Sequence, residues 1–505
     1  MEVLQRTANR GSISTGSYEI DNSLKFDSAN SEYLYIHRDA SGSDWNRLLW
    51  TASMWVKHIP TESSATSPKE RMFGAADAQS DFDIRFRGQP IGFRNNSDVD
   101  GVAELRTTAV YRDYSSWYHV VAVWDTANGT AGNRMRLYVN GEEVTSFSTD
   151  TQPSQNEKSI WGKKNDGTDG DVAHTIGAYY NASSGFAQGF NGYMAEVHWV
   201  EGAALAPTEF GEVDSASGIW KPKEADVTYG TNGFYLNFDD SSALGADSSG
   251  NSNNWSLNNI AAADQATDTP TNNFCTINTP FEPLVGGPPT ITEGATIMTA
   301  GSSGQQDSYG TMALFKGKWY FEFSVLNVGG LAIANMFGGV VKVNRLLQGS
   351  YNNAANGHHS HDGGWGGGVN AVGVHSGSGS GFSAVSGSAV DVVVGVAVDM
   401  DNGKIWWASG GTYASSSGTV SNPATATLPQ FTNLLTQYPG EPVVPAFNHY
   451  VHQATTQGAF NFGNPFDHAF TDIGTNSDAN GYGSFAYTPP SGYYAICSKN
   501  LAEYG

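Results

Sequence analysis

The sequence has few cysteines and few charged residues for its length. Only Cys275 and Cys497 occur among 505 residues, which excludes a disulfide-stapled scaffold and a metal site built from several cysteines. Charged residues make up 15% of the chain, and in an ordinary globular domain they make up about 25%. Together with 60 glycines, this composition is typical of turns and short strands rather than of long amphipathic helices.

Basic residues and long apolar runs are also scarce. The 26 Lys and Arg residues against 49 Asp and Glu leave a net charge of −23, and no basic patch interrupts it, so we expect no nucleic-acid partner. The sequence contains no stretch of about 18 apolar residues, so we expect no membrane insertion. Residues 1–15 have no apolar segment after their charges, so we expect no secretory signal and synthesis completed in the cytoplasm.

Short alternating segments are present instead. Met135, Leu137 and Val139 point one way, and Asn140-Gly141 follows them with the two residue types that a type I′ hairpin turn requires. The same period of two recurs in residues 319–325 and 392–398. Helix is expected only as a single turn at residues 206–210. The fold class predicted from this pattern is all-β.

Residues 261–289 contain five prolines and little alternation, so we interpret them as a linker or a strapping segment. They separate a first unit, residues 20–260, from a second unit, residues 290–505. Residues 1–19 precede the first clear strand at residues 23–26 and form an N-terminal arm, either a docking arm or an edge strand.

Three segments of the first unit resemble laminin-G-like and concanavalin A-like jelly rolls. They are SSWYHVVAVWD at 115–125, RMRLYVNGEEV at 134–144, and FNGYMAEVHWVEGAALAPTEFGE at 190–212. The resemblance implies two stacked antiparallel sheets. We expect alternate residues of the first segment to supply an inner face: Trp117, His119, Val121 and Val123.

The second unit resembles SPRY domains. The segments that carry this resemblance are KGKWYFEFSV at 316–325, residues 391–407, and residues 443–450 with 460–466. The resemblance implies a second bent β-sandwich that presents loops to partners, usually proteins. A Gly- and His-rich insertion departs from the family pattern. The chain is therefore expected to hold two antiparallel β-sandwiches in tandem, the first laminin-G/concanavalin A-like and the second SPRY-like.

A jelly roll followed by a SPRY-like domain resembles structural or fibre proteins of marine tailed bacteriophages. That arrangement implies a non-catalytic virion surface protein, a fibre, tail or capsid-surface component, that attaches to host surface glycans or proteins. It also implies other virion proteins as partners, a homo-oligomer, and a location on the exposed particle surface. An architectural decoration or cement protein is the first alternative, and a polysaccharide-degrading enzyme is the second.

The carboxylates that glycoside hydrolysis needs are not found at the expected spacing. Retaining enzymes place two carboxylates about 5–5.5 Å apart across a cleft. Glu212 and Asp214 alternate correctly, but Ala216 stands at the third position. Glu196 and Glu201 are five residues apart, on opposite faces of an extended strand. We therefore expect no enzyme.

The densest cluster of ligand-type residues is GHHSHDGGW, residues 357–365. His359 and His361 share a side of an extended chain, and Asp362 follows them, so the cluster is a candidate transition-metal site. Trp365 is a candidate stacking platform for a sugar ring. The third interpretation is an exposed glycine-rich loop without a ligand, and all three remain open.

Trp45 is the other candidate sugar platform, because Asp44 and Asn46 beside it indicate an exposed turn, whereas Trp55 follows strand alternation and is expected in the core. Calcium is a candidate cofactor, because laminin-G-like domains often bind it with acidic oxygens at the sheet rim. Two groups of aspartates are candidate ligands, or are turn-forming residues: Asp77, Asp81 and Asp83, and Asp239, Asp240 and Asp247.

Overall fold

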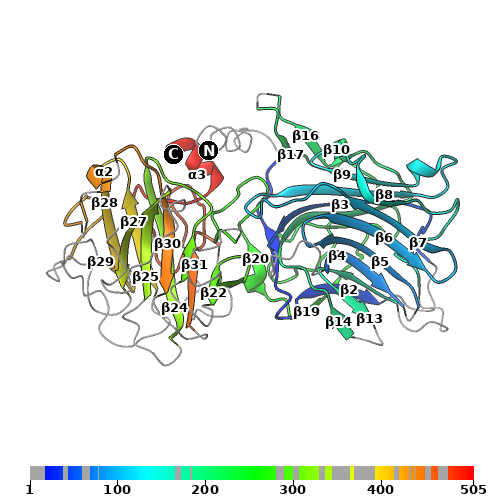
Figure 1. The fold of residues 1–505 in the computed structure, drawn as a ribbon, viewed down its shortest axis with the longest axis horizontal. Coiled ribbons are helices and arrows are strands. Elements are labelled where there is room, and N and C mark those ends of the chain that lie inside the picture. The colour runs from blue at the N-terminus through cyan, green and yellow to red at the C-terminus, as the bar shows by residue number, and fades with distance from the viewer. Residues whose placement is uncertain are drawn as a thin grey trace. The chain divides into compact units, whose positions relative to one another are not determined.

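The computed structural model describes residues 18–37, 44–59, 69–77, 79–164, 172–181, 185–215, 217–279, 289–299, 306–328, 336–343, 364–368, 393–413, 420–429, 431–432, 434–437, 439–449, 456–464 and 476–505. The chain divides into two compact units, Met1–Thr271 and Asn272–Gly505 (Figure 1). Within the described parts, no helix is long and apolar enough to span a membrane.

The first unit contains two large antiparallel sheets. In order across the first sheet lie β10 (Glu142–Glu143), β9 (Met135–Val139), β8 (Tyr118–Asp125), β3 (Leu49–His58), β15 (Gly192–Glu201), β1 (Ser23–Phe26) and β20 (Gln265–Ala266), and β18 (Phe234–Leu236) also pairs with β15. The second sheet runs β11 (Phe147–Thr151), β7 (Gly101–Thr107), β6 (Ile91–Ser97), β5 (Asp81–Arg87), β4 (Lys69–Ala76), β12 (Ala173–Ile176), β2 (Tyr33–His37) and β19 (Ser256–Asn258).

Short elements complete this unit. They are the hairpins β13 (Tyr179–Asn181) with β14 (Gly185–Ala187) and β16 (Gly211–Val213) with β17 (Trp220–Pro222), and the 3₁₀ turns η1 (Ala131–Asn133), η2 (Pro207–Glu209) and η3 (Ala262–Asp264). The helical turn predicted at residues 206–210 is confirmed by η2.

Aromatic side chains from both sheets fill the space between them. Trp50 of β3 lies parallel to Trp124 of β8 at 6.2 Å between ring centroids, and its edge meets Phe82 of β5 at 5.6 Å. All three belong to one buried cluster that draws on both sheets. The first unit is therefore a β-sandwich.

The inner face of β8 is the opposite of the one predicted. Val120, Ala122 and Trp124 enter the core between the sheets. Val121 and Val123 instead pack on the outer face of the sheet in a separate small cluster, beneath the chain that follows β15. The prediction failed because both faces of β8 are apolar, so alternation alone did not show which face meets the other sheet.

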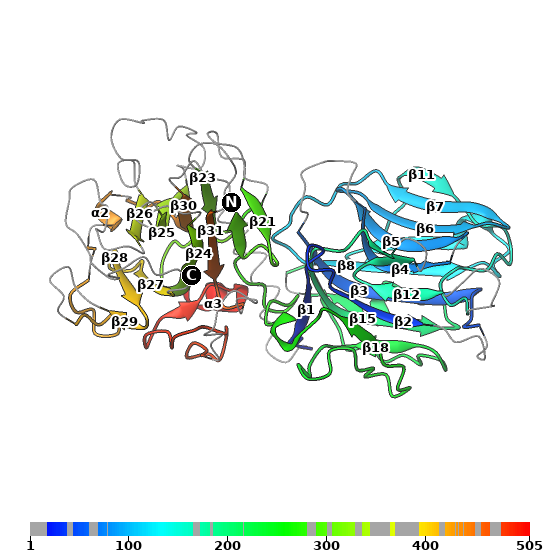
Figure 2. The same ribbon diagram turned by 90° about the horizontal axis from the view of Figure 1, so that it is seen from below.

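Strand β15 contains a β-bulge that decides which side chains it presents. The β3–β15 ladder shifts register between Ala195 and His198, and Glu196 has a φ of 50°. The extra residue turns the apolar side chains of β15 to the core: Met194, Val197 and Trp199. Glu196 and His198 then lie on the outer face of the sheet, where β18 runs beside β15 (Figure 2).

The second unit also contains two sheets. The larger runs β21 (Thr290–Thr292), β22 (Ile297–Thr299), β31 (Thr456–Asn461), β24 (Lys318–Val328), β27 (Val394–Asp399), β28 (Lys404–Ser409) and β29 (Thr412–Tyr413), with β32 (Tyr494–Ala495) pairing parallel to β24. The smaller runs β23 (Gln306–Tyr309), β30 (Val443–His449), β25 (Met336–Lys342) and β26 (Gly364–Gly368). Among its described residues, the helices are α2 (Leu434–Gln437) and α3 (Ser498–Tyr504).

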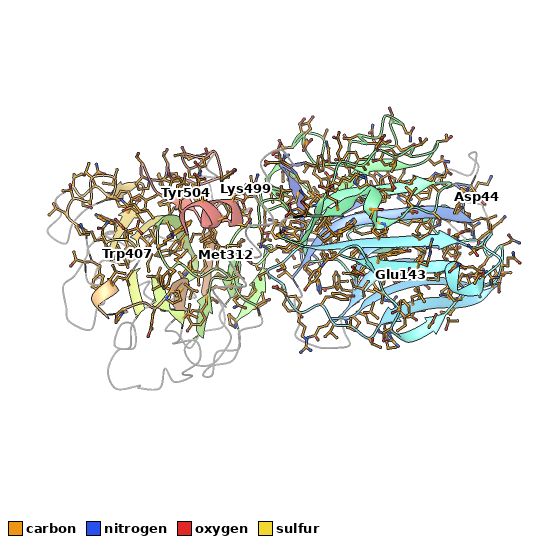
Figure 3. The ribbon with its side chains drawn as sticks, turned by 90° about the horizontal axis from the view of Figure 1, so that it is seen from above. Asp44, Glu143, Met312, Trp407, Lys499 and Tyr504 are labelled. Atoms are coloured by element: carbon orange, nitrogen blue, oxygen red, sulfur yellow. The ribbon has the colours of Figure 1, made fainter. Side chains whose placement is uncertain are left out.

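These two sheets pack face to face through large aromatic residues. Phe323 of β24 meets Phe447 of β30 at 5.7 Å between ring centroids. Trp407 of β28, labelled in Figure 3, is fully buried and donates its indole hydrogen to the carbonyl of Gly338 in β25, 3.2 Å away. The predicted all-β fold class with two sandwich units is confirmed.

The first unit continues beyond Ile260 into the predicted linker. There β20 pairs with β1, and Asp268 forms a fully buried ion pair with Lys57, 2.6 Å between Nζ and Oδ2. Trp117 donates its indole hydrogen to the other oxygen of Asp268 at 2.9 Å. The described part of residues 261–271 is therefore built into the first sandwich.

Several predicted site residues fall in parts that the structure does not describe. His359, His361 and Asp362 lie outside the described residues, as do residues 1–17 of the predicted arm. Trp365 has its backbone in β26, opposite Val340 of β25. The predictions for these residues stay predictions.

Candidate functional site

A polar cavity of about 340 Å³ lies on the outer face of β15 in the first unit. Its position follows from the bulge, because the bulge brings a carboxylate and an imidazole to that face. The lining residues come from the start of the chain, β15, the segment after β17, and β18 with the loop after it: Tyr18, Glu19, Ile20, Asp21, Glu196, His198, Glu224, Ala225, Tyr229, Tyr235, Asn237, Asp239, Ser248 and Ser249.

Glu196 is buried in this cavity, and tyrosine hydroxyls hold both of its oxygens. Tyr18 donates to Oε2 at 2.8 Å, and Tyr235 donates to Oε1 at 2.7 Å. The two hydroxyl oxygens are 3.0 Å apart. Since a carboxylate has about four acceptor positions, Glu196 retains capacity for a further donor.

His198 lies against the same tyrosines. Its ring stacks on Tyr235 with 4.3 Å between centroids and 8° between planes, and its Nδ1 is 2.8 Å from the hydroxyl of Tyr229. Its Nε2 is 3.6 Å from Glu196 Oε2. The buried part of the cavity is thus one connected network of a carboxylate, an imidazole and three phenols.

The electrostatic field of the cavity is negative. Burial, followed by the charge of Glu196, raises the pKa of Tyr18, Tyr229 and Tyr235 above the ordinary tyrosine value. Burial also raises the pKa of Asp239, and the nearby charge of Glu196 adds to the shift. A second negative charge is therefore unfavourable in the cavity, whereas a hydrogen-bond donor or a cation is favoured.

The exposed part of the lining is acidic as well. Glu19, Asp21, Glu224 and Asp239 are exposed, and Asn237, Ser248 and Ser249 add amide and hydroxyl groups. None of the lining residues is Lys or Arg. The cavity can therefore accept hydrogen bonds from many directions.

Sequence reasoning missed this site. Regular alternation places Glu196 and His198 on the same face as Met194, and the structure separates them only through the bulge. One sequence signal was available, because Met194, Val197 and Trp199 interrupt the period of two by one residue. The partners Tyr18 and Tyr235 are distant in sequence and gave no signal.

A serine and a histidine also meet on the outer face of this sheet, at the contact of β3 with β8. Ser53 Oγ is 2.8 Å from His119 Nε2, and Trp220 donates its indole hydrogen to His119 Nδ1 at 3.0 Å. An indole can only donate, so the Nε2 of His119 carries the imidazole hydrogen and donates it to Ser53. Burial lowers the pKa of His119 to about 3. His119 in this state cannot accept the serine proton, and the pair does not form a nucleophile.

The prediction that Trp45 is an exposed sugar platform is wrong. Trp45 is buried, with Trp199 at 4.8 Å, His174 at 5.0 Å and Trp161 at 6.1 Å between ring centroids. Trp55 is buried, as predicted.

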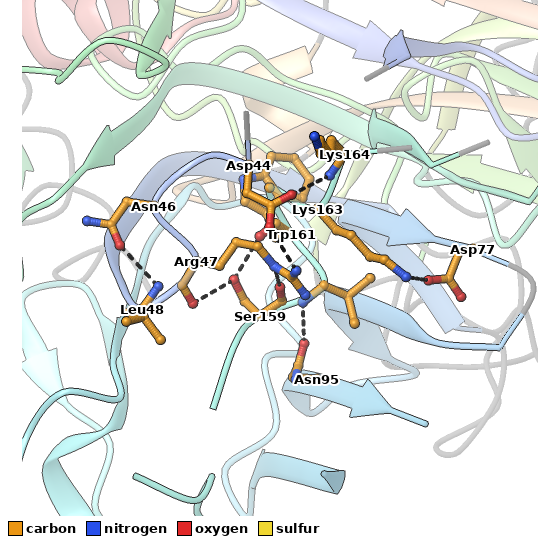
Figure 4. A network of polar contacts seen from close by, with 12 residues as sticks. Asp44, Asn46, Arg47, Leu48, Asp77, Asn95, Ser159, Trp161, Lys163 and Lys164 are labelled. Atoms are coloured by element: carbon orange, nitrogen blue, oxygen red, sulfur yellow. Dashed lines mark hydrogen bonds and ion pairs between the residues drawn. The ribbon is translucent and has the colours of Figure 1, made fainter. Parts of the chain in front are cut away.

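The polar neighbours of Trp45 form a network that closes over the core. Asp44 accepts from the Lys164 backbone at 3.0 Å, and Arg47 donates to the carbonyl of Ser159 at 2.5 Å (Figure 4). Asp44 and Asn46 were the basis for predicting an exposed turn. They hold the turn while Trp45 itself points inward.

The first aspartate group predicted for calcium is occupied by cationic side chains. Asp77 pairs with Lys163 at 2.7 Å, as Figure 4 shows. Asp81 pairs with Arg94 at 2.5 Å, and Asp83 bridges two arginines of the same face: Arg71 at 3.2 Å and Arg85 at 2.5 Å. Carboxylates already neutralised in this way do not fit a calcium site.

The second aspartate group makes turns. Asp240 accepts from the backbone and hydroxyl of Ser242, and Asp247 accepts from the backbones of Tyr235 and Ser249. Across the described residues, no group of three or more His, Cys, Asp or Glu side chains is arranged to hold a metal ion. The residues present therefore do not fit calcium at either predicted position.

Residues 28–209 match a family model described as the concanavalin A-like lectin/glucanases superfamily. The first sandwich is thus concanavalin A-like. No curated protein matches the chain.

Solved structures similar to this chain have low sequence identity and low TM-scores. The SPRY domain of human HERC1 is 12% identical, with 36% of this chain and 96% of that chain covered and a TM-score of 0.26. The CBM40 of the Ruminococcus gnavus IT-sialidase is 15% identical, with 37% and 93% covered and a TM-score of 0.25. Domain 4 of AbnA, a Geobacillus stearothermophilus arabinanase solved with arabinotriose, is 17% identical, with 34% and 69% covered and a TM-score of 0.24.

Proposed function

We propose that this protein is a non-catalytic glycan-binding protein on the surface of a bacteriophage virion, where it attaches the particle to host surface glycans. The observation that carries the proposal is the polar cavity on the outer face of β15. Its volume lies at the lower end of the range of roughly 300–1,000 Å³ found for small-molecule sites. A sugar residue presents many hydroxyl donors, and the carboxylates and phenols of the cavity supply acceptors for them.

The fold supports a binding role for the first unit. The concanavalin A-like model that matches residues 28–209 covers lectins as well as glucanases. The virion location, the other virion proteins as partners and the homo-oligomer rest on the domain arrangement described from the sequence.

The glycan proposal is tested with the full chain on an array of bacterial surface polysaccharides. Ser248 is exposed on the cavity wall, so Ser248→Trp fills the cavity without replacing a buried residue. We expect wild type to bind at least one polysaccharide and Ser248→Trp to bind it at least tenfold more weakly. Ser242→Trp is the matched control, because Ser242 is exposed and outside the lining. Equal binding by Ser248→Trp and wild type would show that the cavity is not the glycan site.

The virion role is tested separately. Mass spectrometry of purified particles is expected to detect the chain, and the isolated protein is expected to compete with particles for adsorption to host cells. Presence in the particle without competition would favour the architectural alternative, and absence from the particle would refute the virion role.

One observation favours a second candidate, a polysaccharide-degrading enzyme. Glu196 and Asp239 line the same cavity, and burial, together with the charge of Glu196, raises the pKa of Asp239. Glycoside hydrolysis uses two carboxyl groups, one of which has a raised pKa and acts as the acid. Release of reducing ends by wild type, lost in Asp239→Asn, would establish this activity in place of simple binding.

A further inference from the structure

We infer that the cavity on β15 selects a cationic amino sugar, one whose amino group is free and protonated. This inference rests on the proposed glycan-binding function and names the chemical class of its ligand.

The charge of the cavity lining favours a cationic ligand. Five carboxylates, those of Glu19, Asp21, Glu196, Glu224 and Asp239, surround the cavity, and no lining residue is Lys or Arg. Even a positive charge on His198, which also lines the cavity, would leave the carboxylates in excess. Coulomb repulsion therefore disfavours sialylated, uronic or phosphorylated sugars, and an ammonium group is attracted.

The carboxylates of the cavity lie in two places, one at its buried end and four at its rim. Glu196 lies at the buried end with its oxygens held by two tyrosines, and the other four carboxylates lie at the exposed rim. Asp21 and Glu224 at the rim are exposed, and they make no hydrogen bond or ion pair with other side chains in the described part of the chain. The rim can therefore engage an ammonium while the buried end accepts a hydroxyl.

The shape and lining of the cavity favour an amino sugar over a metal ion or a lysine side chain as its ligand. The described residues hold no group of three acidic or histidine side chains that could enclose a metal ion. The lining also offers hydroxyl, amide and phenol groups around a space of about 340 Å³, which a slender lysine side chain does not fill. A polyhydroxylated ring that carries an amine matches both the charge and the polar lining.

The test measures binding of three short oligosaccharides to the full chain by isothermal titration calorimetry at pH 6 and low salt. We use oligomers of glucosamine, N-acetylglucosamine and galacturonate, which are cationic, neutral and anionic. We expect the glucosamine oligomer to bind at least tenfold more tightly than the neutral one, and the anionic one to bind most weakly. The preference for glucosamine should disappear at pH 9, where the amine loses its proton, and should shrink as salt is added.

Variants connect the preference to the rim. Asp21→Asn with Glu224→Gln removes two rim charges and is expected to reduce the preference at least fivefold, without a change in the folded circular dichroism spectrum. The control is Asp100→Asn with Glu142→Gln, two exposed carboxylates outside the cavity lining, and it should keep the wild-type preference.

The outcomes separate this inference from the function on which it rests. Equal binding of the cationic and neutral oligomers overturns the amino-sugar assignment. Trilysine is measured by the same method as a cationic peptide, and tighter binding of trilysine than of either oligomer also overturns the assignment. If a neutral glycan still binds and Ser248→Trp abolishes that binding, the glycan-binding function stands without this inference. Failure of every glycan to bind overturns both.

Discussion

At the scale of single residues, Trp45 shows how strongly one buried aromatic side chain stabilises the first unit. Truncating a buried tryptophan leaves a cavity and costs about 3–5 kcal/mol. We expect Trp45→Ala to lower the free energy of unfolding of the first unit by that amount, measured by urea denaturation. Leu257→Ala is the control, because Leu257 is partly exposed, and it should cost less than about 1 kcal/mol. An unchanged urea midpoint for Trp45→Ala would contradict the buried position.

Glu322 is a buried carboxylate with a pH-dependent effect on the second unit. Its oxygens accept from Tyr320, Asn461 and the backbones of Ala486 and Tyr487, all within 3.1 Å. Burial nevertheless raises its pKa from 4.5 to about 7. At a pH between 4.5 and about 7, Glu322 is protonated in the folded state but has lost its proton in the unfolded state. The stabilising contribution of Glu322 is therefore fully present below about pH 4.5 and is lost as the pH rises to 7.

The expected size of this effect is on the order of 3 kcal/mol between pH 5 and pH 8. Urea denaturation across this range should show the second unit becoming less stable as the pH rises. Glu322→Gln cannot titrate, so we expect a lower stability overall and a flatter dependence on pH. If Glu322→Gln keeps the wild-type slope, another group is responsible.

At the scale of elements, period-two alternation was sufficient to predict strands and one hairpin turn. Asn140 and Gly141 have φ values of 50° and 82°, as the predicted type I′ turn requires. Alternation does not report an inserted residue, and the cavity on β15 exists because of one. When both faces of a strand are apolar, alternation also does not show which face meets the other sheet. For this reason the inner face of β8 was predicted wrongly. The cavity also needs Tyr18 and Tyr235, and contacts between residues so distant in sequence were not predictable from local pattern.

The bulge gives a direct prediction. Deleting Val197 removes one residue of the bulge and restores a regular ladder in which Glu196 takes the core position of Val197. We expect the first unit to lose its cooperative unfolding transition, measured by near-ultraviolet circular dichroism and urea denaturation. Deleting Ala195 is the matched control, because it also restores a regular ladder but leaves Met194, Val197 and Trp199 facing the core, and it should leave the transition in place. A cooperative transition in the Val197 deletion would contradict the assignment of faces on β15.

At the scale of the whole molecule, the chain holds two units with separate buried clusters. The boundary at Thr271 lies eleven residues beyond the end of the first unit predicted from proline content, residues 20–260. Proline content did not predict that residues 262–268 supply η3, a short strand and the Asp268 carboxylate to the first sandwich. Asp268 is distant in sequence from Lys57, and no local pattern connects them.

The boundary is tested with two fragments, residues 1–271 and residues 1–260. The longer one keeps Asp268 beside Lys57, whereas the shorter one removes this carboxylate and the pairing of β20 with β1. Removing one partner of a buried ion pair costs about 3–5 kcal/mol, so the shorter fragment should be less stable by at least that amount in urea denaturation. Asp268→Ala in the longer fragment isolates the contribution of the ion pair from that of the strand. Because the cavity lies wholly within residues 18–249, the longer fragment should also retain the glycan binding of the full chain. Equal stability of the two fragments would place the end of the first unit at residue 260 after all.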